Sequence, residues 1–161
     1  MVTWAMEPWQ FSVGIDMKKI SSSAIGTSET ATKPIINESD LSHTYWENAR
    51  KGLFVVQICA SCGQSRHYPK YLCANCLSDS FHWKTIENKG TIHSWTVCHH
   101  AFHPAFKPDL PYILVSVDMN ETGIRALGIW RGNSELKIGL PALAHFVNAS
   151  ESRVELFFES P

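Results

Sequence analysis

The chain has 161 residues, of which 44% are hydrophobic and 18% are charged, and its formal net charge is -1. This composition is typical of a globular protein with one ordinary domain, or with two small domains that share an interface. The 14 lysines and arginines are balanced by 15 aspartates and glutamates. Such a balance disfavours nucleic-acid binding, which draws most of its non-specific affinity from a surplus of basic residues.

Two further classes of protein are disfavoured by the sequence. No apolar run approaches the roughly 20 residues that cross a bilayer, so we expect no membrane insertion. The first residues, MVTWAMEPWQF, lack the basic start and the continuous apolar core of a signal peptide. We therefore expect a cytoplasmic protein, in which paired cysteines are metal ligands or redox groups more often than disulfides.

Residues 1–36 differ in composition from the rest of the chain. Trp4, Trp9 and Phe11 show neither helical nor strand periodicity, and the segment that follows them, SSSAIGTSETATKP, is half Ser or Thr. Such a segment buries too little apolar surface to offset the entropy lost on ordering. We expect an extended or disordered N-terminal arm, either free or with its aromatic side chains docked on a partner.

A short helix is predicted after this arm. Residues 37–40 offer polar side chains that can cap it, and Leu41, Tyr45 and Ala49 recur every four residues on one face. Gly52 can adopt the left-handed conformation that ends a helix.

Short strands dominate the remainder of the sequence. The segment LFVVQIC predicts a strand over 53–59 that leads into the first of two cysteine pairs. Later strands are predicted near 81–87, 90–98, 112–119, 124–130, 142–148 and 153–158. Five or six short strands within 80 residues, with no long helix between them, predict a small barrel, and the OB-fold is the commonest barrel of this size.

Four cysteines form two CxxC pairs with ten residues between them: Cys59, Cys62, Cys73 and Cys76. Two such turns, brought together by a hairpin, supply the four soft ligands of a closed tetrahedral zinc site. Iron in the same sulfur cage is the alternative metal. A thioredoxin-like dithiol is disfavoured, because it needs only one CxxC pair and a βαβ context. Four protein ligands leave no open coordination position, so the metal is predicted to be structural.

Two other stretches contain chemically active side chains. In CHHAFHP (98–104), Cys98 could act as a nucleophile, or three histidines could bind metal: His99, His100 and His103. Neighbouring residues of a strand point to opposite faces, so we expect a buried strand thiol followed by a polar loop. In RHYPK (66–70), solvated loop charges are the default expectation, and contact with an anionic ligand is the alternative.

These patterns together resemble one family, the acyl-CoA-associated proteins with an N-terminal rubredoxin-like zinc ribbon and a C-terminal OB-fold. The resemblance covers residues from about 40 to 158. It is carried by Tyr45-Trp46, Gly52-Leu53, Gln57-Ile58-Cys59, Cys62-Gly63, Tyr68-Pro69-Lys70, Cys73, Cys76, Gly90-Thr91-Ile92, Ser94-Trp95-Thr96-Val97, Pro111-Tyr112 and Ile138-Gly139-Leu140-Pro141. The arm, residues 1–36, has no counterpart in this pattern.

The sequence patterns and the resemblance together predict a mainly β protein with three parts: the arm over 1–36, a short helix plus zinc ribbon over 37–80, and an OB-fold over 81–161. The resemblance also implies a non-catalytic accessory subunit that assembles with a thiolase-like, aldolase or synthase partner acting on acyl-CoA and helps to form the CoA-binding channel. The partner is expected to hold the catalytic residues and most of the CoA ester. Arg66 and Lys70 are then candidates to contact the CoA phosphates across the subunit interface.

A nucleic-acid-binding protein is the alternative function, because zinc ribbons and OB-folds also serve that role. It requires a basic groove with exposed aromatic side chains, and Trp83, Trp95 and Trp130 are the candidates. We expect these three side chains to serve barrel core and strand packing instead.

Overall fold

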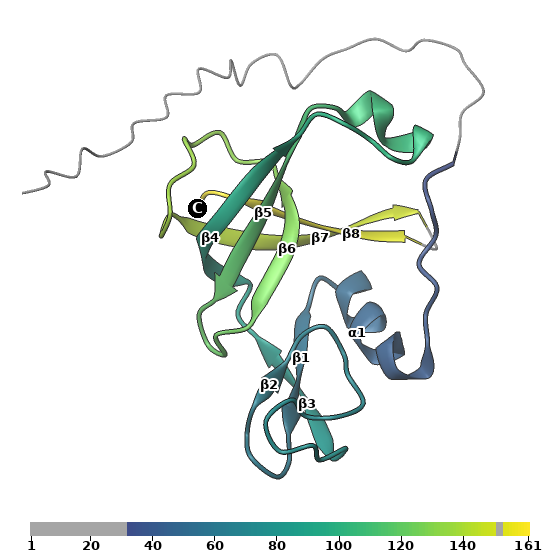
Figure 1. Cartoon of the computed structure of the whole chain (residues 1–161), viewed down its shortest axis with the longest axis vertical. Helices are drawn as coiled ribbons and strands as arrows, with labels where there is room; N and C mark the ends of the chain where they lie inside the picture. The colour runs from purple at the N-terminus through teal and green to yellow at the C-terminus, as the bar shows by residue number, and fades with distance from the viewer. Residues whose placement is uncertain (1–31, 151–152) are drawn as a thin grey trace, which may run out of the picture.

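The computed structural model describes residues 32–150 and 153–161, so most of the predicted arm lies outside the described residues. One helix, eight strands and a 3-10 helix make up this part of the chain (Figure 1). In chain order they are α1 (Asp40–Arg50), β1 (Phe54–Cys59), β2 (Ser65–Arg66), β3 (Phe81–Ile86), β4 (Lys89–Cys98), η2 (Pro104–Asp109), β5 (Tyr112–Met119), β6 (Arg125–Trp130), β7 (Pro141–Ser150) and β8 (Arg153–Glu159).

The predicted helix is confirmed as α1. Ser39 is its N-cap residue, with the extended backbone usual at that position. Tyr45 and Ala49, from the predicted apolar face, are buried. Gly52 follows the helix with φ of +76°, the left-handed conformation that its sequence position predicts. The helix therefore begins and ends where local sequence signals place it.

Strands β1, β2 and β3, between Phe54 and Ile86, form the ribbon. They make a three-stranded sheet in the order β2-β1-β3. β1 pairs antiparallel with β3 along its whole length, from Phe54 opposite Ile86 to Cys59 opposite Phe81. The division between residues 80 and 81 stays a prediction. In the described fold, β3 belongs to this sheet, and the barrel starts with β4.

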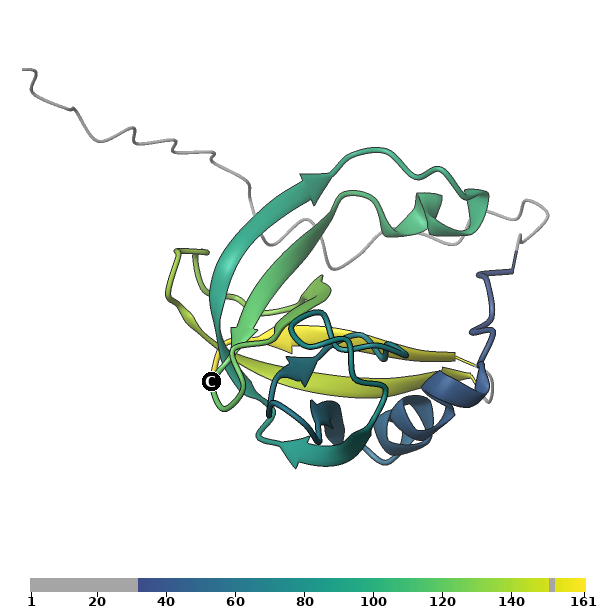
Figure 2. The same ribbon diagram turned by 60° about the horizontal axis from the view of Figure 1, so that its bottom comes forward.

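The other five strands close a barrel in the order β4-β5-β6-β8-β7. Neighbouring strands are antiparallel except β6 and β8, which pair in parallel at Ile129–Phe157 and Trp130–Phe158. β4 and β5 carry η2 on the loop that joins them, whereas β7 and β8 form a long hairpin (Figure 2). The predicted fold class, a mainly β chain with a zinc ribbon and an OB-fold, is confirmed.

One apolar core joins the two parts. It runs from Tyr45 of α1 and Phe54 of β1 into the barrel. The ring centroids of Tyr45 and Phe54 lie 6.3 Å and 5.4 Å, respectively, from that of Phe146 in β7. The helix thus fills the space between the ribbon sheet and the β7–β8 hairpin (Figure 1).

The connection from β3 to β4 is two residues long, Glu87 and Asn88. The Asn88 side chain donates to the carbonyl oxygen of Gly52 (3.1 Å), and its own carbonyl oxygen accepts from the Ala144 N–H (2.8 Å). The connection is therefore bonded to both the end of α1 and β7.

Within the described residues, no helix has the length and apolarity needed to span a membrane.

Candidate metal centre

The two CxxC turns have the same backbone hydrogen bonds. Gly63 N–H donates to the carbonyl oxygen of Cys59, and Leu77 N–H donates to that of Cys73, both at 2.9 Å. Gly63 and Leu77 both have positive φ, 74° and 60°. Glycine adopts this conformation without cost, whereas a leucine pays for it. In the sequence, Gly63 indicates the left-handed residue of the first turn. The left-handed conformation of Leu77 could have been inferred only from the equal CxxC spacing of the second pair.

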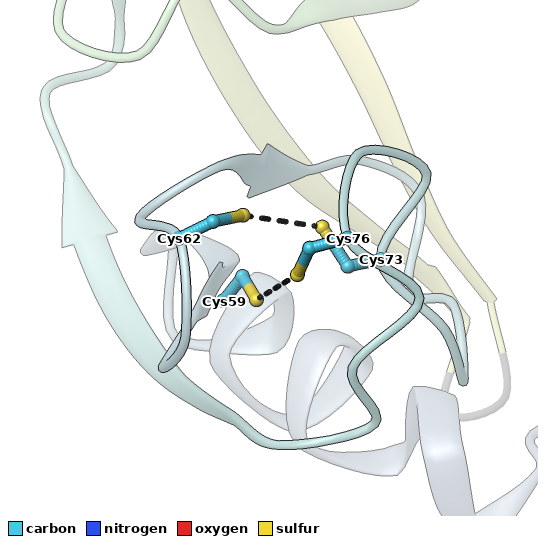
Figure 3. A group of neighbouring side chains, drawn as sticks. All are labelled: Cys59, Cys62, Cys73 and Cys76. Carbon is cyan, nitrogen blue, oxygen red and sulfur yellow. Dashed lines mark hydrogen bonds between the residues drawn. The ribbon is translucent and has the colours of Figure 1, made fainter.

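The four cysteine sulfurs converge (Figure 3). All lie within 4.8 Å of one another, and the Cys59–Cys76 and Cys62–Cys73 sulfur pairs are each 3.6 Å apart. A tetrahedron with zinc–sulfur bonds of about 2.3 Å has sulfur–sulfur edges of about 3.8 Å. The four cysteines are therefore positioned for tetrahedral metal binding. They are the one such group of at least three potential ligands in residues 32–150 and 153–161.

Backbone donors prepare the first cysteine of each turn for ionisation. Burial opposes ionisation of Cys59, but N–H groups of Cys62 and Ser61, together with the Arg66 side chain, outweigh it and lower the pKa of this thiol to about 5. The N–H groups of Cys76 and Asn75 lower the pKa of Cys73 in the same way. Each turn thus supplies hydrogen bonds that stabilise one thiolate.

The last cysteine behaves differently. The Ser78 N–H favours its ionised form, but the neighbouring sulfurs of Cys62, Cys59 and Cys73, together with burial, raise the pKa of Cys76 to about 12. Four thiolates at these distances repel one another. A divalent cation among them offsets that repulsion, so the donor set fits a metal ion better than it fits four free thiols.

Arg66 lies inside the ribbon and is only 5% exposed. Its Nη1 donates to the carbonyl oxygens of Lys70 (3.2 Å) and Tyr71 (3.3 Å). Its Nη2 donates to those of Ser78 (3.1 Å) and Ser80 (3.3 Å). This differs from the expectation of a solvated side chain, because the fold brings four carbonyl oxygens around one guanidinium. Contact between Arg66 and CoA stays a prediction.

Lys70 is exposed, and its backbone N–H donates to Oε1 of the buried Gln57 (2.9 Å). No ion pair within the described part of the chain involves its ammonium group. An open hollow of about 300 Å³ lies beside it, lined by Gln64, Ser65, Arg66, His67, Lys70, Ala74 and Asn75. Of the two cations predicted to contact CoA, Lys70 is thus the one whose charged group is exposed and makes no ion pair with the described residues.

His67, between these two cations, is part of the aromatic core. Its ring centroid lies 5.3 Å from that of Phe54 and 5.6 Å from that of Tyr45. Neither ring nitrogen has a hydrogen-bond partner among the described residues. Burial lowers the pKa of His67 to about 4, so this side chain is neutral at physiological pH.

The CHHAFHP stretch does not form a second centre. Cys98 ends β4, is half-buried, and pairs with Tyr112 of β5. His99 and His100 are exposed in the following loop, and His103 Nδ1 accepts a backbone N–H at the start of η2. These side chains do not group as metal ligands within the described ranges. The expected strand position of this thiol and the loop after it are therefore confirmed, but the thiol is half-buried and not buried as expected.

The three candidate stacking residues lie in different surroundings. Trp130 is buried, and Trp83 packs against the core while partly exposed. Trp95 is 40% exposed on β4. Core packing is therefore found for Trp130 in the barrel and for Trp83 from the ribbon sheet. Trp95 lies outside the core, on the exposed stretch of β4 from His93 to Thr96.

Comparison with known proteins agrees with this arrangement. A family model for the ChsH2 rubredoxin-like zinc ribbon domain matches residues 46–82, and one for the ChsH2 C-terminal OB-fold domain matches residues 83–151. A curated protein of Thermomonospora curvata, a probable enoyl-CoA hydratase alpha subunit, is 34% identical over 122 residues. The aligned region is 73% of this chain and 36% of that protein, so the chain spans about a third of the relative's length.

Two solved structures are also similar. The Ltp2-ChsH2(DUF35) aldolase contains a chain that matches with a TM-score of 0.67 and 28% identity, over 80% of this chain and 98% of that one. A DUF35-family protein of unknown function from Sulfolobus solfataricus matches with a TM-score of 0.54 and 14% identity, over 76% and 86% of the two chains, and shows the shared fold. With both of its structural parts matched in order, the chain belongs to the ChsH2 family of zinc-ribbon and OB-fold proteins.

Proposed function

We propose that this chain is a non-catalytic subunit that assembles with an enzyme acting on acyl-CoA. The observation that carries the proposal is the similarity to a chain of the Ltp2-ChsH2 aldolase, which extends over 98% of that chain. The name of the curated relative, a subunit of an enoyl-CoA hydratase, adds support for acyl-CoA chemistry. A partner with the thiolase fold is our first expectation, and an aldolase or synthase partner fits the same role.

The four cysteines hold one structural zinc ion in this proposal. Support comes from their sulfur–sulfur distances and from the match to a zinc-ribbon family model. With four protein ligands, the ion has no open position for water or substrate, so it stabilises the fold and does not take part in a reaction. A site of reduced thiolates is consistent with the cytoplasm, where we place the protein.

Lys70 is the residue that we propose to contact the CoA ester, most of which the partner binds. Its exposed ammonium group borders the hollow on the ribbon hairpin, and the bond from its N–H to Gln57 fixes its backbone. A cation held in this way suits the phosphates of CoA, because little further entropy is lost on binding. Arg66 lines the same hollow and adds positive charge to its wall.

The assembly is tested by isolating the tagged chain from its own cells at increasing salt concentrations. We expect one stoichiometric subunit, identified by mass spectrometry as an acyl-CoA enzyme, that turns over acyl-CoA in the complex. The isolated chain is expected to show no such turnover. Recovery of nucleic acid with a steep salt dependence, and no enzyme subunit, would contradict the proposal and support the alternative function.

The CoA contact is tested in the assembled complex with Lys70→Ala. We expect the KM for acyl-CoA to rise about tenfold at unchanged kcat, the response to losing uniform binding. Lys137→Ala is the matched control, since this lysine is exposed on the barrel. An unchanged KM for acyl-CoA in an intact complex would show that Lys70 does not contact the CoA ester and is an ordinary solvated lysine.

A further inference from the structure

The zinc centre that we propose has a charge that the ribbon must accommodate. Zinc with four thiolates has a net charge of +2 - 4 = -2. Two of the cysteines, Cys59 and Cys73, are only 2% and 0% exposed, so part of this charge lies away from water. Buried charge is costly unless an opposite charge or hydrogen-bond donors compensate for it. The inference below rests on this zinc centre.

Arg66 is the one buried charged residue in the part of the chain that the structure describes. Its Nη2 and the Cys73 N–H both donate to the Ser78 carbonyl oxygen, at 3.1 Å and 2.9 Å, so the guanidinium lies close to a metal ligand. Its guanidinium also lies over the Phe81 ring, with the Cζ atom 5.5 Å from the ring centroid. The Nε atom is buried and has no hydrogen-bond partner among the described residues, so a donor remains available on this side chain.

The same side chain joins the segments on both sides of the second CxxC turn. Lys70 and Tyr71, whose carbonyl oxygens bind Nη1, lead into Cys73. Ser78 and Ser80, whose carbonyl oxygens bind Nη2, follow Cys76. Arg66 therefore fixes the entry and the exit of this turn. The Ser80 carbonyl oxygen that it binds also accepts the N–H of Ala60 in the first turn, at 3.0 Å, so the same side chain is linked to both turns. These bonds use the planar fork of a guanidinium, which the single nitrogen of a lysine does not reproduce.

We propose that Arg66 is the internal counter-ion of the zinc–thiolate centre and the positioning residue that holds its two turns together. Its positive charge offsets half of the net charge of -2, and its four carbonyl contacts keep the second cysteine pair in place for the metal. Loss of the side chain accelerates release of the metal.

The test measures zinc transfer to an excess of chromogenic chelator from four proteins: the wild type, Arg66→Met, Arg66→Lys and Lys70→Met. We expect transfer from Arg66→Met to be at least about tenfold faster, the scale found when residues that support metal ligands are removed. Arg66→Lys is expected to lie between Arg66→Met and the wild type, because it keeps the charge and loses the fork. Lys70→Met, the matched control on the same hairpin, is expected to behave as the wild type.

A second measurement separates this role from a general effect on folding. In the cobalt-substituted proteins, loss of the positive charge beside the centre raises the energy of the thiolate electrons. The thiolate-to-cobalt charge-transfer band of Arg66→Met is then expected at lower energy than that of the wild type and Lys70→Met. Normal zinc content with wild-type transfer rates in both Arg66 variants, or an unshifted cobalt band, would overturn the inference alone. If Arg66→Met does not fold, wild-type transfer from Arg66→Lys overturns it.

If the purified wild-type protein contains no zinc, the proposed metal centre is wrong, and this inference fails with it. The zinc stoichiometry of the wild type thus distinguishes the two failures.

Discussion

The ribbon and the barrel are stabilised by different means. The barrel buries apolar side chains from all five of its strands, among them Val115, Val117 and Phe158, each 0% exposed. The tip of the ribbon instead leaves large apolar side chains in solvent, with Tyr71 69% and Leu77 72% exposed. A segment that buries so little depends on other interactions, which here are the cysteine centre and the contacts of Arg66.

One chain can therefore use two kinds of stabilisation, one sensitive to changes in buried side chains and the other to the supply of metal. Burial in the barrel depends on side-chain volume and is indifferent to metal. Order at the ribbon tip depends on thiolate ligands and therefore on metal supply. Because Tyr45 and Phe54 link the two parts through one core, damage to either should lower the stability of the whole chain, by different routes.

The largest effect is expected from Cys73→Ser. It removes a buried ligand, and in modules of this kind metal binding contributes about 10 kcal/mol or more to folding, so we expect a loss of several kcal/mol. Urea unfolding and elemental analysis measure stability and zinc content together. Cys98→Ser is the control, expected to keep one zinc ion per chain; loss of zinc from this variant would contradict the assignment of the centre.

Phe158→Ala should weaken the barrel without affecting the metal. The side chain is fully buried, and its ring lies close to the Gly128 backbone, so truncation leaves a cavity. We expect the free energy of unfolding to fall by about 3–5 kcal/mol. Phe102→Ala, at a side chain that is 98% exposed, should change it by less than about 0.5 kcal/mol. Zinc content should stay at the wild-type value in both variants. Zinc loss from Phe158→Ala would show that the metal centre depends on packing in the barrel.

Acid should destabilise the chain through His67. Burial lowers its pKa in the folded state to about 4, whereas an unfolded histidine titrates near 6.5. Above pH ~6.5 both states are neutral; as the pH falls towards ~4, the unfolded state takes up the proton first, which lowers stability by about 3 kcal/mol.

His67→Phe removes this titration, so its stability should exceed that of the wild type increasingly as the pH falls through this window. Chemical unfolding at several pH values measures the difference. His82→Phe, at an exposed position, is the control for the exchange of a histidine for a phenylalanine. A wild-type pH dependence in His67→Phe would show that His67 does not stay neutral in the folded protein.

The smallest effect is expected at the junction between α1 and β1. Gly52 has φ of +76°, and an added Cβ would meet no atom within 4 Å, so Gly52→Ala tests backbone strain alone. We expect a loss of about 1 kcal/mol, measured by thermal unfolding. Gly52→Asn should lose less, because asparagine tolerates the left-handed conformation. Equal losses from the two variants would point to an effect other than backbone strain.

Local signals in the sequence were sufficient for much of the fold and for the cysteine set. The four-residue recurrence of Tyr45 and Ala49, the turn glycine at 52 and the CxxC spacing all act over a few residues, so each could be interpreted without the structure. The strand segments could be recognised in the same way. Their closure into an OB-fold barrel came from the number of strands and from the family resemblance.

The environment of the hairpin side chains could not be predicted in this way. Arg66 is buried because carbonyl oxygens from residues 70–80 surround it, and His67 is neutral because Tyr45 and Phe54 pack around its ring. Those partners lie 4 to 22 residues away in the sequence, and only the fold brings them together. The three basic or potentially basic side chains of RHYPK (66–70) give no indication in the sequence of which one faces solvent.

The two-residue connection between β3 and β4 limits how the ribbon sheet can move relative to the barrel. A hinge needs residues whose φ and ψ are free to change. Asn88 has its side chain bonded to Gly52 and its carbonyl oxygen bonded to Ala144. Rotation at this connection would break both bonds, so we expect the ribbon sheet and β7 to keep one orientation to each other and to move as a unit.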